Sequence, residues 1–234
     1  MKEINKVAVI GDSVLKGVVF NETNGRYQAL TESCATMLQK CLGISILNRS
    51  RFGSTVDKGN QLLDKAIENG LDCEMAVIEF GGNDCDFDWR AVSEHPEISH
   101  QPKTPLKHFL QTMSDMVGKL RKNDIEPILM SLPPVDGDRY FHHLSKLGFK
   151  ADSLMQFLGD PYMISRFHES YSLAITHLAQ ELKCLYVPIR EAFLANFHYG
   201  KLMCSDGIHP NQEGHLLMKQ VFLDTVTNRR AILA

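Results

Sequence analysis

Residues 7–17 read VAVIGDSVLKG, a short apolar run that ends abruptly at Gly11, Asp12 and Ser13. The apolar residues are nearly continuous instead of alternating, which is typical of a strand buried on both faces. A parallel sheet covered by helices buries its strands in this way, and such sheets bind ligands at the carboxyl ends of their strands. The run therefore predicts an α/β fold that holds a carboxylate and a hydroxyl at its ligand-binding edge.

Four further runs have the same character, and amphipathic stretches separate them. The predicted strands are 6–10, 44–48, 75–80, 126–130 and 184–189, and the predicted helices include 27–42, 57–69, 106–122, 164–182 and 212–228. Because strands and helices alternate, we expect right-handed crossovers and a parallel sheet sandwiched between helices. In the flavodoxin-like strand order 2-1-3-4-5, the first three strands are direct neighbours.

Length and composition indicate an ordinary globular protein. The chain has 234 residues, of which 44% are hydrophobic and 23% charged, so we expect a single domain spanning 1–234. The formal net charge of -3 gives no reason to expect nucleic acid as a partner. No apolar run approaches the ~20 residues of a membrane span. The N-terminus passes at once into the first strand, which predicts an intracellular, cytoplasmic protein. The oligomeric state is left open.

Cysteine and histidine spacing favours neither disulfides nor metal. The six cysteines contain no C-x-x-C pair, and the adjacent His142 and His143 would point apart on a helix. We expect reduced, mostly buried thiols and no metal site.

Two connections after predicted strands are longer than most loops, at 84–105 and 132–160. The second carries apolar side chains at partly helical spacing. We expect it to be a small helical cap beside the active site; a dimer contact or surface packing is the alternative. Trp89 and Tyr140, one in each connection, are candidate substrate-binding aromatics, although packing of the loops would use the same side chains.

Polar motifs follow three of the predicted strands. They are GDS at 11–13, RFGST at 51–55 and GGND at 81–84. Because the carboxyl ends of parallel strands meet at one edge, we expect Ser13, Gly53 and Asn83 to lie within about 10 Å of one another.

A fourth motif, DGIHPNQEGH at 206–215, places Asp206 three residues before His209. At this spacing the carboxylate can accept a hydrogen bond from Nδ1 of the imidazole and leave Nε2 free. An Asp-His pair with a free nitrogen is a general base, and the Ser13 hydroxyl is the nucleophile that such a base would activate.

These segments resemble, in kind and order, the blocks of the SGNH or GDSL-type hydrolase family. GDS is similar to the first block, Gly53 to the second, the G-x-N-D of 81–84 to the third, and the D-x-x-H of 206–209 to the fifth. The first block reads GDSV where many members have GDSL, which changes a packing residue. The resemblance spans nearly the whole chain. It implies a three-layer α/β/α fold, hydrolysis of esters through an acyl-enzyme, and no metal or organic cofactor.

The resemblance also implies a role for each site residue. Ser13 would be the nucleophile, His209 the base and then the acid, and Asp206 the group that orients His209. The oxyanion hole would consist of the backbone N–H groups of Ser13 and Gly53 and the side-chain amide of Asn83. Gly53 permits a close approach of backbone to substrate, and Asn83 is a donor whose strength does not depend on pH.

For the substrate, we expect a small-molecule ester with a short acyl group, such as an acetyl ester of a carbohydrate. No long apolar tract suggests a lipid groove, and the long connections mix charged side chains with aromatics. Lysophospholipase, thioesterase and acyltransferase chemistry would use the same residues and stay open. Outside catalysis, the alternative is a flavodoxin-like ligand-binding module, but the phosphate-binding glycine motifs are missing from the sequence and the D-x-x-H motif would have no task there.

Overall fold

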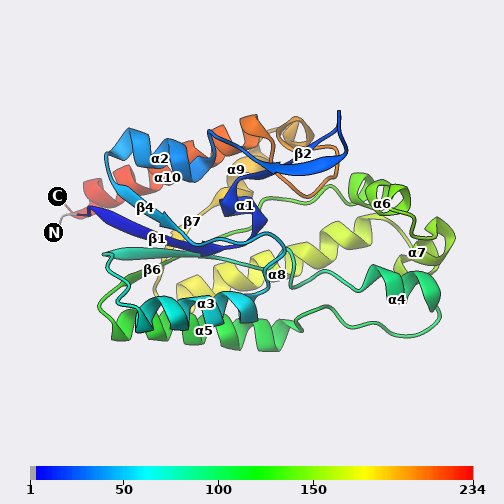
Figure 1. The fold of residues 1–234 in the computed structure, drawn as a ribbon, viewed down its shortest axis with the longest axis horizontal. Coiled ribbons are helices and arrows are strands. Elements are labelled where there is room, and N and C mark those ends of the chain that lie inside the picture. Colours follow the sequence, from blue (N-terminus) through cyan, green and yellow to red (C-terminus); the bar gives the residue numbers. More distant parts are fainter. Residues whose placement is uncertain (1–3, 234) are drawn as a thin grey trace.

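Five parallel strands form the central sheet of the computed structural model, which describes residues 4–233 and their side chains up to residue 227. The strands are β1 (Lys6–Gly11), β4 (Ser45–Asn48), β5 (Met75–Glu79), β6 (Glu126–Met130) and β7 (Leu185–Val187). Their spatial order is β4-β1-β5-β6-β7 and each neighbouring pair is parallel (Figure 1). The predicted order 2-1-3-4-5 is confirmed.

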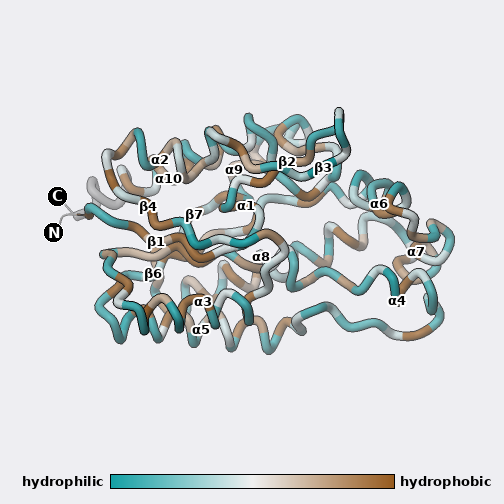
Figure 2. The backbone as a smooth tube through the Cα atoms, viewed as in Figure 1, coloured by the Kyte–Doolittle hydropathy of each residue, from teal (hydrophilic) through white to brown (hydrophobic). Residues whose placement is uncertain are grey.

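Side chains of the inner strands point alternately into two separate cores. Along β1, Ala8 and Ile10 belong to the core on one face, and Val7 and Val9 to the core on the other. The central strands are accordingly the most hydrophobic stretch of the backbone in Figure 2. Burial on both faces explains why the strands read as continuous apolar runs.

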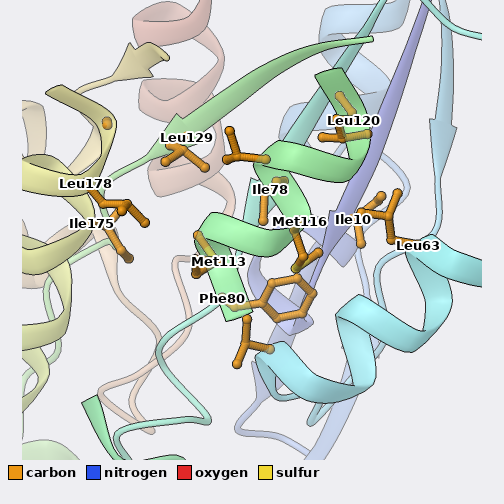
Figure 3. Packing of buried hydrophobic residues seen from close by; sticks show 14 of the residues in the cluster. Ile10, Leu63, Ile78, Phe80, Met113, Met116, Leu120, Leu129, Ile175 and Leu178 are labelled. Atoms are coloured by element: carbon orange, nitrogen blue, oxygen red, sulfur yellow. The ribbon is translucent and has the colours of Figure 1, made fainter. Parts of the chain in front are cut away.

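Helices cover both faces of the sheet and complete a three-layer α/β/α sandwich (Figure 1). One layer consists of α3 (Val56–Glu68), α5 (Leu106–Lys122) and α8 (Tyr162–Glu181). The other consists of α1 (Ser13–Lys16), α2 (Cys34–Leu42), α9 (Ile189–Ala195) and α10 (Gln212–Leu233). Figure 3 shows the first core, where Ile10 and Ile78 of adjacent strands meet Leu63 of α3 and Met116 of α5.

The predicted helix at 27–42 is wrong in its first part. β3 (Arg26–Ala29) lies there, paired as a hairpin with the preceding β2 (Val18–Asn21), and α2 begins only at Cys34. The hairpin turn is stabilised by Asn21, whose Oδ1 accepts the N–H of Thr23, and Ser33 caps α2 by accepting the N–H of Thr36. The exposed β3 side chains gave no apolar alternation that would have marked a strand.

The two long connections pack against each other at one end of the molecule (Figure 1). The connection at 84–105 contains α4 (Trp89–Glu94), and residues 132–160 contain α6 (Gly137–Lys146) and α7 (Ala151–Leu158). These helices share a small third core that includes Val92, Leu144 and Leu154. A 3-10 turn, η1 (Tyr199–Leu202), precedes the segment that leads into α10. Within the described range, no helix has the length and apolarity needed to cross a bilayer.

Candidate active site

The polar segments that follow the strands meet at the carboxyl edge of the sheet. Asp12 caps α1, which begins at Ser13, so the N–H of Ser13 is among the first of a helix and has no partner within that helix. The structure brings the predicted nucleophile, its base and the other two predicted oxyanion-hole residues to one cavity of about 130 Å³. They are Ser13, Gly53, Asn83 and His209.

Ser13, His209 and Asp206 form a continuous hydrogen-bonded chain. The Oγ of Ser13 lies 2.9 Å from Nε2 of His209, and Nδ1 of His209 lies 2.6 Å from Oδ2 of Asp206. All three side chains are buried, and Asp206 is 0% exposed. Burial raises the pKa of Asp206, but the hydrogen bonds and charge of His209 outweigh it and hold the pKa below its ordinary value. Asp206 therefore stays ionised beside the imidazole.

The turn that carries Asp206 and His209 is fixed by its own backbone and by contact with α6. Oδ1 of Asp206 accepts the N–H groups of Ile208 and His209, both at 3.2 Å. Gly207 has φ +78°, and a Cβ there would lie 2.6 Å from the carbonyl oxygen of Asp136. A residue with a side chain would thus push the turn away from α6.

Gly53 and Asn83, which the resemblance assigns to the oxyanion hole, both line the cavity beside Ser13. The backbone at Gly53 has φ +68°, a conformation that favours glycine, while an added Cβ would meet nothing within 4 Å. Nδ2 of Asn83 donates to Oδ2 of Asp12 at 2.9 Å. An amide nitrogen carries two hydrogens, so Asn83 keeps a second one for a ligand.

Residues 9–217 match the model of the GDSL-like lipase/acylhydrolase family, a range that includes the whole hydrogen-bonded chain. The chain belongs to this family. It is a carboxylic ester hydrolase, and the resemblance predicted from the motifs is confirmed. A comparison with curated proteins gave no match.

Solved structures of GDSL hydrolases share the fold over almost the full length of this one. The lipase/acylhydrolase from Enterococcus faecalis is 15% identical with a TM-score of 0.69, over 97% of each chain. An acetylxylan esterase from Geobacillus stearothermophilus, solved as a catalytic mutant, is 21% identical with a TM-score of 0.63, over 97% of this chain and 96% of that one. A GDSL-like lipase from Bacteroides thetaiotaomicron is 17% identical with a TM-score of 0.63, over 98% of this chain and 91% of that one.

A buried pair of carboxyl groups lies next to Ser13 of this GDSL hydrolase, and the sequence analysis missed one of them. Glu79, the last residue of β5, is 1% exposed, and its Oε2 accepts the N–H of Asp12 at 3.2 Å. Burial, and after it the charge of Asp12, raises the pKa of Glu79 well above its ordinary value. Burial also raises the pKa of Asp12. Two carboxylates so placed cannot both ionise, so Glu79 holds a proton and Asp12 carries the charge that accepts from Asn83.

Trp89 and Tyr140 both line the cavity of the GDSL hydrolase, and their polar atoms are already engaged. Nε1 of Trp89 donates to Oδ1 of Asp86 at 2.7 Å, and the hydroxyl of Tyr140 lies 3.3 Å from the same carboxylate. Lys103 pairs with Asp86 at 2.8 Å. The two aromatic residues therefore offer ring faces, not hydrogen bonds, to a ligand.

Two further aromatic residues lie at the mouth of the cavity, and the sequence analysis did not select them. The ring of Phe52 is stacked on His209 with centroids 6.2 Å apart, and Tyr27 contacts His209 edge-on at 5.2 Å. Phe52 is 51% exposed. Its position directly before Gly53 was the signal that could have identified it.

The acidic residue of the G-x-N-D motif has a structural task. Asp84 is fully buried and accepts the N–H of Val56, at the start of α3, at 2.9 Å and 3.2 Å. It ties the loop after β5 to the helix that follows β4. Within the described part of the chain, no cluster of His, Cys, Asp and Glu is arranged to hold a metal ion.

Proposed function

We propose that this GDSL hydrolase is a serine esterase that cleaves short-chain carboxylic esters through an acyl-enzyme. The observation that carries the proposal is the chain from Ser13 Oγ to His209 Nε2, at 2.9 Å, and from His209 Nδ1 to Asp206, at 2.6 Å. A serine hydroxyl is a weak nucleophile until a neighbouring base removes its proton, and the imidazole is within the reach that this transfer needs.

The reaction would take place in two stages. Oγ of Ser13 attacks the ester carbonyl carbon while Nε2 of His209 accepts the hydroxyl proton, and the imidazolium then protonates the leaving alcohol. Water, activated by the same nitrogen, hydrolyses the acyl-enzyme and restores Ser13. Throughout, the ionised Asp206 holds the imidazole tautomer and stabilises the imidazolium.

The oxyanion that forms in each stage would receive hydrogen bonds from three donors. They are the backbone N–H groups of Ser13 and Gly53 and the second amide hydrogen of Asn83. Since Asp12 accepts the first amide hydrogen, the second is held in one direction before substrate arrives. Such preorganised donors stabilise charge that exists only in the transition state.

A short acyl group, such as the acetyl group of a carbohydrate ester, is supported by the size and lining of the cavity. Its volume is about 130 Å³, and its walls include the rings of Trp89 and Tyr140, which can pack against a sugar. Lysophospholipase, thioesterase and acyltransferase reactions would use the same site and differ in the substrate that fits it.

The helical insertion at 132–160 is proposed to act as a cap that shapes this cavity. Phe87 lines the cavity and packs edge-on against Phe157 of α7, with ring centroids 5.1 Å apart. Replacing Phe157 by Ala should remove the ring that holds Phe87 in the cavity wall. Phe87 could then move aside, and longer acyl groups should become the preferred substrates. An unchanged preference across the ester series would contradict the cap.

The decisive experiment compares initial rates on para-nitrophenyl esters from acetate to long-chain acids, with wild type and Ser13→Ala side by side. We expect hydrolysis that Ser13→Ala abolishes and that is fastest for the shortest acyl groups. A long-chain optimum would replace the short-chain proposal by a lipid or thioester substrate. Equal rates in both proteins would refute the serine mechanism.

A further inference from the structure

The cavity wall contributed by α8 contains one polar side chain among apolar neighbours. Ile164, Phe167 and His168 of this helix all line the cavity. His168 is 5% exposed and takes no part in the chain of Ser13, His209 and Asp206. A buried imidazole in an apolar wall is unfavourable unless its two nitrogens find partners.

Only one nitrogen of His168 has a partner among the residues that the structure describes. Nη1 of Arg190 lies 3.5 Å from Nδ1, a long contact in which the guanidinium can only donate. Nδ1 therefore presents its lone pair, and the ring hydrogen resides on Nε2. Burial, and after it the charge of Arg190, lowers the pKa of His168 to about 3. The ring is thus a neutral donor near pH ~7.

The charge around His168 selects the kind of group that Nε2 could bind. Nη2 of Arg190 is paired with Glu169 at 2.7 Å, so the guanidinium behind the ring is neutralised and gives no preference for an anion. The indole and phenol groups on the cavity wall already bond to Asp86. His168 is left as a donor without a partner among the described residues, 95% buried, between the apolar side chains that α8 contributes to the cavity wall.

We infer that Nε2–H of His168 donates a hydrogen bond to an uncharged oxygen of the substrate, which makes His168 a specificity-determining residue. The inference rests on the proposed esterase function. The substrate class is then an ester that carries a hydroxyl, ether or carbonyl oxygen in addition to those of the scissile bond. That oxygen belongs either to the acyl group or to the alcohol, and the experiment has one arm for each.

Each arm compares two esters of equal size that differ by one oxygen in place of one methylene. The acyl arm uses para-nitrophenyl methoxyacetate and para-nitrophenyl butanoate. The alcohol arm uses tetrahydropyran-4-yl acetate and cyclohexyl acetate. The quantity measured is the ratio of kcat/KM for the oxygen ester to that for the carbon ester. Differences in intrinsic reactivity cancel when the same ratio is compared between variants.

In one arm, His168→Leu should lower this ratio about fivefold, the value of one neutral hydrogen bond. His168→Gln keeps an N–H donor and should restore part of the ratio. His168→Phe is a second apolar variant, filling the volume of the ring in case the leucine protein does not fold. The matched control is His177→Leu, an exposed position on the same helix, which should leave the ratio unchanged.

The outcomes separate this inference from the proposed function. Equal ratios for wild type and the apolar variants in both arms, with hydrolysis still dependent on Ser13, would overturn the role of His168 alone. Hydrolysis that persists in Ser13→Ala would overturn both. A ring hydrogen found on Nδ1 by nitrogen NMR of the free protein would also refute the donor role, without any variant of His168.

Discussion

Asn83 is a residue whose two amide hydrogens have separate tasks. One is fixed by Asp12, whose negative charge depends on Glu79 retaining the proton that the buried pair shares. The other is free to meet substrate. The strength of the proposed oxyanion hole therefore depends on Glu79, the last residue of β5, as well as on the donors themselves.

Replacing Asn83 by Ala should lower kcat by about 10²–10³ with little change in KM, because the lost hydrogen bond is formed mainly in the transition state. Ser13→Ala should reduce kcat by several orders of magnitude. Asn69→Ala, at the exposed end of α3, is the matched control and should leave kcat unchanged. An Asn83→Ala enzyme within a fewfold of wild type would exclude the side chain from the oxyanion hole.

At the scale of elements, two turns of the site favour glycine for different reasons. Gly53 and Gly207 both have positive φ, but only Gly207 is packed so tightly that a Cβ would strike backbone. At Gly53, only the backbone conformation disfavours a side chain. At Gly207, both the backbone conformation and the close packing against α6 disfavour a side chain.

Gly53→Ala should lower the free energy of unfolding by about 1–2 kcal/mol, the usual penalty for a side chain in the left-handed region. Gly207→Ala should cost a further ~1–3 kcal/mol, because the turn must shift away from the Asp136 carbonyl. Denaturant unfolding of the two variants measures both values. Equal losses would show that the turn before His209 yields without strain.

The elements that sequence predicted well were those whose side chains are governed by burial. The inner strands β1, β5 and β6 were evident because both of their faces are covered, and the polar residues that follow β1 and β5, Ser13 and Asn83, fell on one edge. β3 was taken for helix because its side chains are exposed and carry no pattern. The sequence analysis did not identify Glu79 because it lies in an apolar run, where a carboxyl group is tolerated only through its partner Asp12. The sequence analysis did not identify His168 because its proposed role depends on its contact with Arg190, which lies on another element.

Across the whole molecule, buried histidines link stability to pH. Burial, and after it the charge of His209, lowers the pKa of His215 to about 4, and burial does the same to His168, to about 3. In the unfolded chain a histidine titrates near pH ~6.5. Between the folded and unfolded pKa values, unfolding therefore takes up protons. The contribution of these two histidines to the free energy of unfolding is fully present above pH ~6.5 and is lost as the pH falls toward ~4.

His215→Gln should make the free energy of unfolding less dependent on pH, by up to about 1.4 kcal/mol per pH unit in this window. The side chain is 0% exposed, and its Nδ1 accepts the N–H of Cys34, a bond that glutamine can replace. Urea unfolding at several pH values between about 4 and 7 provides the slope. An unchanged slope would mean that His215 is protonated in the folded protein.

The hydrogen bond between Ser13 and His209 joins positions 196 residues apart in the chain. During synthesis, the hydroxyl of Ser13 leaves the ribosome long before the imidazole of His209, so an unfinished chain would have the proposed nucleophile without its base. In the proposed mechanism, ester hydrolysis can begin only once the segment at 206–215 has brought His209 beside Ser13. In refolding experiments, helical content would therefore return first and ester hydrolysis last. The recovery of activity would then report when the final step of folding is complete.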